Sequence, residues 1–149
     1  MRRPPFLIPS LLALLLALPA VAADQKTADG WPSTREGALA RRWVEAFSKG
    51  EKAMRATLPE ILAKEALAKT GMDERMERYR ALHDKLGSLM LVKIEKSAPG
   101  ELVALLATSE MEQLSFTFKA QTQAPFKLLA VTIAMNQRQG HGQGGGFHH

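Results

Sequence analysis

The chain has 149 residues, of which 46% are hydrophobic and none is cysteine. The absence of cysteine excludes disulfide bonds, so the fold must be stabilised by its hydrophobic core. The formal net charge is +5, but basic and acidic residues are interleaved, as in EALAKTGMDERMERYRALHDK. Such mixing is typical of a solvated helical surface, and we therefore expect no nucleic-acid partner.

Residues 1–22 have the three-part layout of a secretory signal peptide. Arg2 and Arg3 precede an apolar run over residues 6–23, which contains small residues in an A-x-A arrangement ending at Ala22. The run is at the short edge of what spans a bilayer, so retention as an anchor is the alternative. The prolines inside the run favour cleavage after Ala22, which leaves no stable membrane anchor. We therefore expect an exported protein, either periplasmic or secreted.

The polar residues 23–32 are typical of a flexible lead-in to one domain over residues 33–135. Ser33 and Glu36 have the spacing of a capping box, in which the serine hydroxyl accepts from an amide three residues ahead. Apolar spacing, glycines and one proline then predict four helices, over residues 33–50, 51–58, 59–71 and 73–86.

After Gly87 the apolar period changes from that of a helix to that of a strand. Four strands are expected, over residues 88–96, 101–109, 112–120 and 126–134. Helices followed by hairpin-linked strands predict an α+β fold with an antiparallel sheet. The second and fourth strands are apolar on both sides, so we expect them to be central or covered on both faces.

Residues 136–149, NQRQGHGQGGGFHH, contain five glycines and three histidines. This composition cannot supply a core, and it predicts a disordered Gly/His tail. His141, His148 and His149 lack the fixed geometry and the additional ligands of a metal site, so we expect no physiological metal binding.

The span from residue 33 to residue 134 resembles a small exported domain of the nuclear transport factor two-like superfamily. The resemblance lies in REGALARRWVEAFSKGEKAMRATL, in ERYRALHDKLGSLMLVKIEKSAPGELVALLA and in LSFTFKAQTQAPFKLLAVTI. It implies a cone of three to four N-terminal helices packed on a curved four-stranded antiparallel sheet, often with a pocket at the open end.

The same resemblance implies partners. Similar domains occur alone or fused to exported serine hydrolases, which makes such a hydrolase a candidate partner. Members of the superfamily often form homodimers through the outer face of the sheet. On this chain that face is expected to bear Leu89 and Leu91.

Four residues are candidates for a binding site. Tyr79 and His83 are four residues apart and share one face of a predicted helix, where a histidine can exchange a proton and a tyrosine can orient a polar group. Trp43 and Phe47 have the same spacing and can form an aromatic wall of a ligand pocket. The alternative is structural, with Trp43 and Phe47 as plain core and the other two as amphipathic residues at its rim.

No segment carries the motif of a hydrolase nucleophile, a phosphate-binding loop or a zinc protease. The predicted strands contain no aspartate and no histidine, so no catalytic residues are assigned. We expect a non-catalytic accessory or binding domain for a small apolar ligand or a protein partner, without a cofactor. The alternatives are a small isomerase or dehydratase-like enzyme using Tyr79 and His83, and a homodimerising structural domain.

Overall fold

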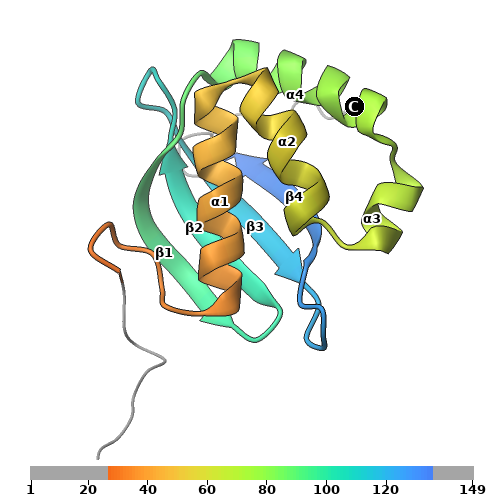
Figure 1. Ribbon diagram of the computed structural model, residues 1–149. Helices are drawn as coiled ribbons and strands as arrows, with labels where there is room; N and C mark the ends of the chain where they lie inside the picture. The colour runs from red at the N-terminus through yellow and green to blue at the C-terminus, as the bar shows by residue number, and fades with distance from the viewer. Residues whose placement is uncertain (1–26, 136–149) are drawn as a thin grey trace, which may run out of the picture.

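A computed structural model describes residues 27–135, in which four helices precede four strands (Figure 1). The helices are α1 (Arg35–Lys49), α2 (Glu51–Ile61), α3 (Lys64–Lys69) and α4 (Met72–Leu86). The strands are β1 (Met90–Ala98), β2 (Glu101–Ala107), β3 (Gln113–Ala120) and β4 (Leu128–Met135). The predicted α+β class is confirmed.

Two predictions concern residues outside this range. The signal peptide over residues 1–22 and the Gly/His tail over residues 136–149, with its three histidines, lie outside the described residues and stay predictions. Among the residues that are described, no helix has both the length and the apolar character needed to span a bilayer.

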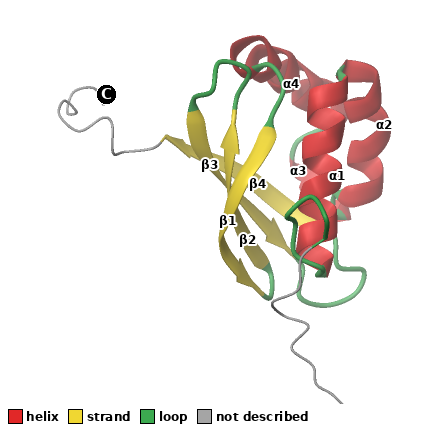
Figure 2. Cartoon of the chain, turned by 90° about the vertical axis from the view of Figure 1, so that its left-hand side faces the viewer, coloured by secondary structure: helices red, strands yellow, loops and turns green. Residues whose placement is uncertain are grey.

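The four strands form one antiparallel sheet in the order β1-β2-β3-β4, and the helices cover one of its faces (Figure 2). Helix α1 packs on β2 and β3, the two central strands. The inner face of these strands supplies the fully buried side chains of Leu102, Leu106, Phe116 and Phe118. The expectation that the second strand is central is confirmed.

The fourth strand was expected to be central or covered on both faces, and this expectation is wrong. Strand β4 lies at an edge of the sheet. Its residues Ala130, Thr132 and Ala134 are exposed, because they pair with the outward-facing residues of β3. These small side chains are compatible with the solvated face of an antiparallel sheet.

The outer face of β1 differs from the expected apolar surface. Register shifts between Leu91 and Lys93 and between Ile94 and Lys96 mark bulges, each of which adds one residue to the strand. The first bulge leaves Leu91 opposite the fully buried Leu106, so Leu91 packs toward the helices. Leu89 is also buried. The prediction that both leucines lie on the outer face is therefore wrong.

Helix α1 (Arg35–Lys49) is capped one residue later than expected. The hydroxyl of Thr34, not that of Ser33, accepts a hydrogen bond from the Gly37 amide at 2.9 Å. The Glu36 carboxylate accepts from the Gly100 amide at 2.8 Å, in the turn between β1 and β2. The predicted capping box is replaced by a tertiary contact that ties the start of α1 to the sheet.

Helix α2 continues through Pro59, where we expected the chain to start a new helix. The proline lies in the last turn of α2, which ends at Ile61. Proline has no backbone N–H, so at this position it removes one hydrogen bond of the helix. The loss is confined to the last turn, because α2 ends two residues later. The predicted third helix is therefore reduced to α3, and the amide of Ala63, just before it, bonds to the Leu128 carbonyl at 2.8 Å.

Residues 27–32 differ from the expected flexible lead-in. The Thr27 amide bonds to the Trp31 carbonyl at 2.7 Å, and the Gly30 amide bonds to the Thr27 carbonyl at 2.9 Å. The Trp31 side chain is 5% exposed and belongs to the hydrophobic core. The part of this segment that the structure describes therefore packs with the domain.

Candidate functional site

The four candidate residues lie together. The rings of Trp43 and Phe47 stack with their centroids 5.2 Å apart, and Phe47 meets Tyr79 edge-on at 5.1 Å. The ring of His83 stacks on Tyr79 at 5.2 Å and also contacts Phe47 at 5.4 Å. The two pairs come from α1 and α4, so this aromatic cluster is where these two helices meet.

The four residues of the aromatic cluster differ in how deeply they are buried. Phe47 is fully buried, and Trp43 and Tyr79 are 8% and 6% exposed. His83 is only half-buried. Trp43 also lies 5.9 Å from the ring of Phe116 and 5.7 Å from that of Phe118, so it is a central member of the core.

The Tyr79 hydroxyl has a structural partner. It donates a hydrogen bond of 2.9 Å to the Phe47 carbonyl, close to the end of α1. Burial, with a smaller contribution from the negative charge of Glu51, raises the pKa of Tyr79 above its ordinary value. A protonated hydroxyl that is already committed to a carbonyl is poorly suited to act as a general base.

A cavity of about 200 Å³ opens beside the aromatic cluster. This is far above the roughly 15 Å³ that a single water requires. The cavity is bounded by α1, α2 and the segment after it, by α4 and by β4. Its lining consists of Trp43, Phe47, Met54, Leu58, Leu62, Arg75, Arg78, Tyr79, Leu82, Ala130 and Val131.

The arrangement of α4 leaves this space open. Figures 1 and 2 show α4 lying across one end of the layer formed by α1 and α2, and its main packing partners are these two helices. The inner face of the edge strand β4 is consequently less covered than that of β2 and β3. Val131 and Ile133 pair with the fully buried Phe118 and Phe116, yet both are only half-buried.

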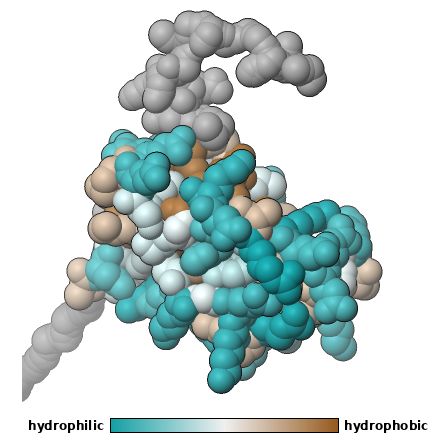
Figure 3. Space-filling model, turned by 90° about the horizontal axis from the view of Figure 1, so that it is seen from above, coloured by the Kyte–Doolittle hydropathy of each residue, from teal (hydrophilic) through white to brown (hydrophobic). Residues whose placement is uncertain are grey.

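The surface at this end of the molecule is mostly hydrophilic. Figure 3 looks down on this end and shows hydrophobic residues in small patches among hydrophilic ones. The exposed large hydrophobic residues of the described chain are Met90, Val92, Met111 and Leu129. None of these four lines the cavity.

Two arginines of α4 supply the charge at the cavity. Arg75 is half-buried and uses its guanidinium to brace α3, donating to the carbonyls of Thr70 at 2.8 Å and Ala66 at 2.5 Å. Arg78 is exposed and pairs with Glu74 at 2.8 Å. Burial, and then the positive charge of Arg78, lower the pKa of Arg75 from its ordinary value.

His83 does not line the cavity. Among the described residues, no carboxylate forms an ion pair with its ring. The described residues also contain no group of three or more histidine, aspartate or glutamate side chains able to hold a metal. The geometry thus brings the rings of Tyr79 and His83 together, but it directs the Tyr79 hydroxyl at the Phe47 carbonyl, and no described carboxylate pairs with His83.

The structure adds lining residues that the sequence analysis did not single out. They come from α2 and the segment after it (Met54, Leu58 and Leu62), from α4 (Arg75, Arg78 and Leu82) and from β4 (Ala130 and Val131). A signal for those of α4 was present, because Arg75 lies four residues before Tyr79 and therefore on the same helix face. The residues of α2 and β4 had no such signal, because whether they border a cavity depends on the tertiary packing of α4 and not on their own sequence.

Comparisons with protein-family models, with curated proteins and with solved structures find no match to this chain. The fold and the cavity are therefore the basis for a functional interpretation.

Proposed function

We propose that this domain is a non-catalytic binding module that holds a small apolar ligand in the cavity between α2, α4 and β4. The supporting observation is the lining itself. Three helices or their flanking segments and one strand contribute aliphatic and aromatic side chains to a space that no described side chain fills. Ligand sites are typically concave and mostly apolar, with a few polar groups that fix orientation.

The enzyme alternative has less support. It requires Tyr79 and His83 to present polar atoms to a bound substrate. The Tyr79 hydroxyl donates to the Phe47 carbonyl instead, and His83 lies outside the lining of the cavity. A binding role needs neither group to be free, because their rings contribute only packing.

Export and the nuclear transport factor two-like resemblance belong to the same proposal. The arrangement of helices before an antiparallel sheet is compatible with that resemblance. An exported accessory module with an apolar cavity would carry or sense a small ligand outside the cytoplasm, alone or beside an exported serine hydrolase.

A cavity-filling substitution tests the proposal. The variant Leu82→Trp places a large ring where a half-buried side chain lines the cavity. Ala81→Trp is the matched control, because Ala81 is exposed on the same helix and does not line the cavity. Binding of decanol is measured by isothermal titration calorimetry.

We expect Leu82→Trp to weaken decanol binding by about tenfold or more, because the added ring occupies the space of the ligand. The control should bind decanol as the unmodified chain does. If the unmodified chain binds no decanol, or if both variants bind it equally well, the cavity is not a ligand site.

A further inference from the structure

The cavity is chemically asymmetric. Leu58, Leu62 and Val131 line it with aliphatic side chains from α2, the segment after it and β4, whereas both charged lining residues, Arg75 and Arg78, come from α4. The two arginines are three residues apart and therefore lie on one face of that helix. A ligand that matches both parts has an apolar body and one anionic end.

The first of the two cations at the cavity is Arg75. It is half-buried, and its only described hydrogen bonds go to the carbonyls of Thr70 and Ala66. Within residues 27–135 no carboxylate forms an ion pair with it. A guanidinium has five N–H donors, so the two carbonyls leave further donors without a described partner, and the nearby negative charge of Glu74 offsets the positive charge only in part. A partly desolvated cation of this kind favours an anion nearby.

The second cation at the cavity is Arg78. Its partner Glu74 is 56% exposed, and the Arg78 side chain is 68% exposed. Ion pairs between exposed side chains contribute little to stability, so a ligand anion can take the place of Glu74 at small cost. Tyr79 does not compete for this role, because its hydroxyl is committed to Phe47.

From this geometry we infer that the ligand is a single-chain carboxylate, whose alkyl chain occupies the apolar part of the cavity and whose carboxylate binds between Arg75 and Arg78. The inference rests on the proposed function, since it assigns a ligand class to the same cavity. A carboxylate is favoured because its two oxygens match the parallel donors of a guanidinium. The modest cavity of about 200 Å³ fits one chain better than a lipid with two.

Three probes with one alkyl chain separate charge from burial. Decanoate, decanol and decyltrimethylammonium are titrated into the full chain by calorimetry, with the two ionic probes below their micelle-forming concentrations and decanol below its solubility limit. We expect decanoate to bind on the order of tenfold more tightly than decanol, because a charge-assisted hydrogen bond is added. The ammonium should bind more weakly than decanol. Added sodium chloride should weaken decanoate binding and leave decanol binding unchanged.

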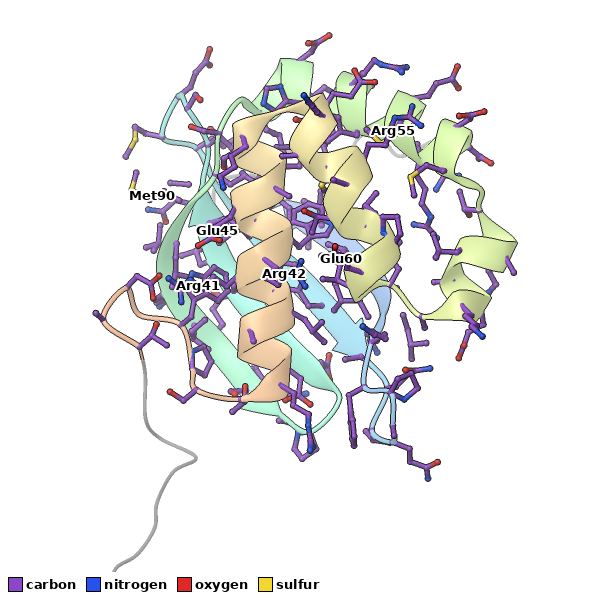
Figure 4. The ribbon with its side chains drawn as sticks, in the orientation of Figure 1. Arg41, Arg42, Glu45, Arg55, Glu60 and Met90 are labelled. Carbon is purple, nitrogen blue, oxygen red and sulfur yellow. The ribbon has the colours of Figure 1, made fainter. Side chains whose placement is uncertain are left out.

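The variant Arg78→Gln should lose most of the preference for decanoate over decanol. Arg42→Gln is the matched control, because Arg42 pairs with Glu60 on the side of α1 and α2 that faces away from the sheet (Figure 4). A double variant, Arg75→Gln with Arg78→Gln, should abolish the preference. If the double variant does not fold, because Arg75 no longer braces α3, the single variant Arg78→Gln and the salt titration still test the carboxylate assignment.

The outcomes separate the two proposals. Equal affinities for decanoate and decanol, or a decanoate preference that Arg78→Gln leaves intact and salt does not weaken, would overturn the carboxylate assignment while the apolar cavity stands. If none of the three probes binds, both the assignment and the proposed function are wrong.

Discussion

Tyr79 joins α4 to α1 through a single hydroxyl, which donates to the Phe47 carbonyl from a ring that is 6% exposed. A carbonyl near the end of a helix has no partner within the helix, so this bond satisfies a polar group that burial would otherwise leave unpaired. The ring contributes separately, because it meets Phe47 edge-on and stacks on His83. The structural interpretation of Tyr79 and its binding interpretation are therefore compatible.

We expect Tyr79→Phe to lower the free energy of unfolding by about 0.5–1.5 kcal/mol, since it removes one buried hydrogen bond and keeps the ring. Urea denaturation followed by circular dichroism measures the change. Decanol binding should be unaffected, because the hydroxyl points to Phe47. A variant as stable as the unmodified chain would show that this hydrogen bond does not stabilise the fold. Thr132→Val is the control, because it removes an exposed hydroxyl.

Arg75 illustrates why a charged residue can belong to a site that is lined mainly by apolar residues. Its guanidinium braces the end of α3, and its position on α4 also places it on the lining of the cavity. The bonds to two backbone carbonyls hold the side chain in one arrangement before any ligand arrives. Preorganisation of this kind reduces the entropy that binding would cost.

Helix α1 is fixed at its start by two side chains with different tasks. Thr34 caps the helix by accepting from the Gly37 amide, and Glu36 reaches the Gly100 amide in the turn between β1 and β2. Gly37 is required here, because a Cβ atom at this position would collide with the Pro32 carbonyl. The first turn of α1 is therefore held both by its own cap and by a contact with the turn between β1 and β2.

Replacing Thr34 with alanine should lower the free energy of unfolding by about 1 kcal/mol, the usual cost of removing an N-cap side chain. Ser33→Ala is the control, since the Ser33 side chain is exposed and does not cap the helix. Thermal and urea denaturation compare the two variants. Should Ser33→Ala be the more damaging change, the capping residue would be Ser33 after all.

The helices α2 and α4 are joined by an ion pair. Arg80 donates to both carboxylate oxygens of Glu51, at 3.0 and 2.9 Å. This hydrogen bonding by Arg80, aided by its positive charge, holds the pKa of Glu51 below its ordinary value. The stabilisation is present above the ordinary glutamate pKa and is lost as the pH falls through the lower pKa of the folded state.

When the pH is lowered from about 6 to about 3, across the ordinary glutamate pKa, the melting temperature of Glu51→Gln should therefore fall by less than that of the unmodified chain. At the higher pH the variant should melt at a slightly lower temperature, because the ion pair is absent. Differential scanning calorimetry at both pH values gives the comparison. Glu110→Gln, at an exposed turn, is the control, and the same pH dependence in both variants would remove Glu51 from the explanation.

For the whole molecule, the sequence predicts the order and class of elements because each has a clear apolar period. The central place of β2 follows from its apolar residues on both sides, but the similar β4 is an edge strand. The bulges of β1 were not predictable, because they depend on the register with β2 and not on the residues of β1 alone. The same holds for the bond between Glu36 and Gly100, which are 64 residues apart.

For the candidate site, the sequence predicts which residues share a helix face. The rings of Trp43, Phe47, Tyr79 and His83 do come together, because each pair is four residues apart on a helix that contacts the other. It does not predict that His83 lies outside the cavity lining. That outcome depends on how α4 packs on α1 and α2, which no local pattern encodes.

The position of α4 has a consequence for how the molecule moves. The centre of the sheet is covered by α1, whereas α4 packs mainly on other helices and borders a space. Segments with fewer buried contacts open at a smaller free energy than the rest of a domain. In a hydrogen-exchange experiment the amides of α3 and α4 should therefore exchange by local opening, and those of β2 and β3 only when the whole chain unfolds. Helix α4 lines the cavity, and its local opening would expose the cavity to solvent. A ligand that fills the cavity should therefore slow hydrogen exchange in this helix first.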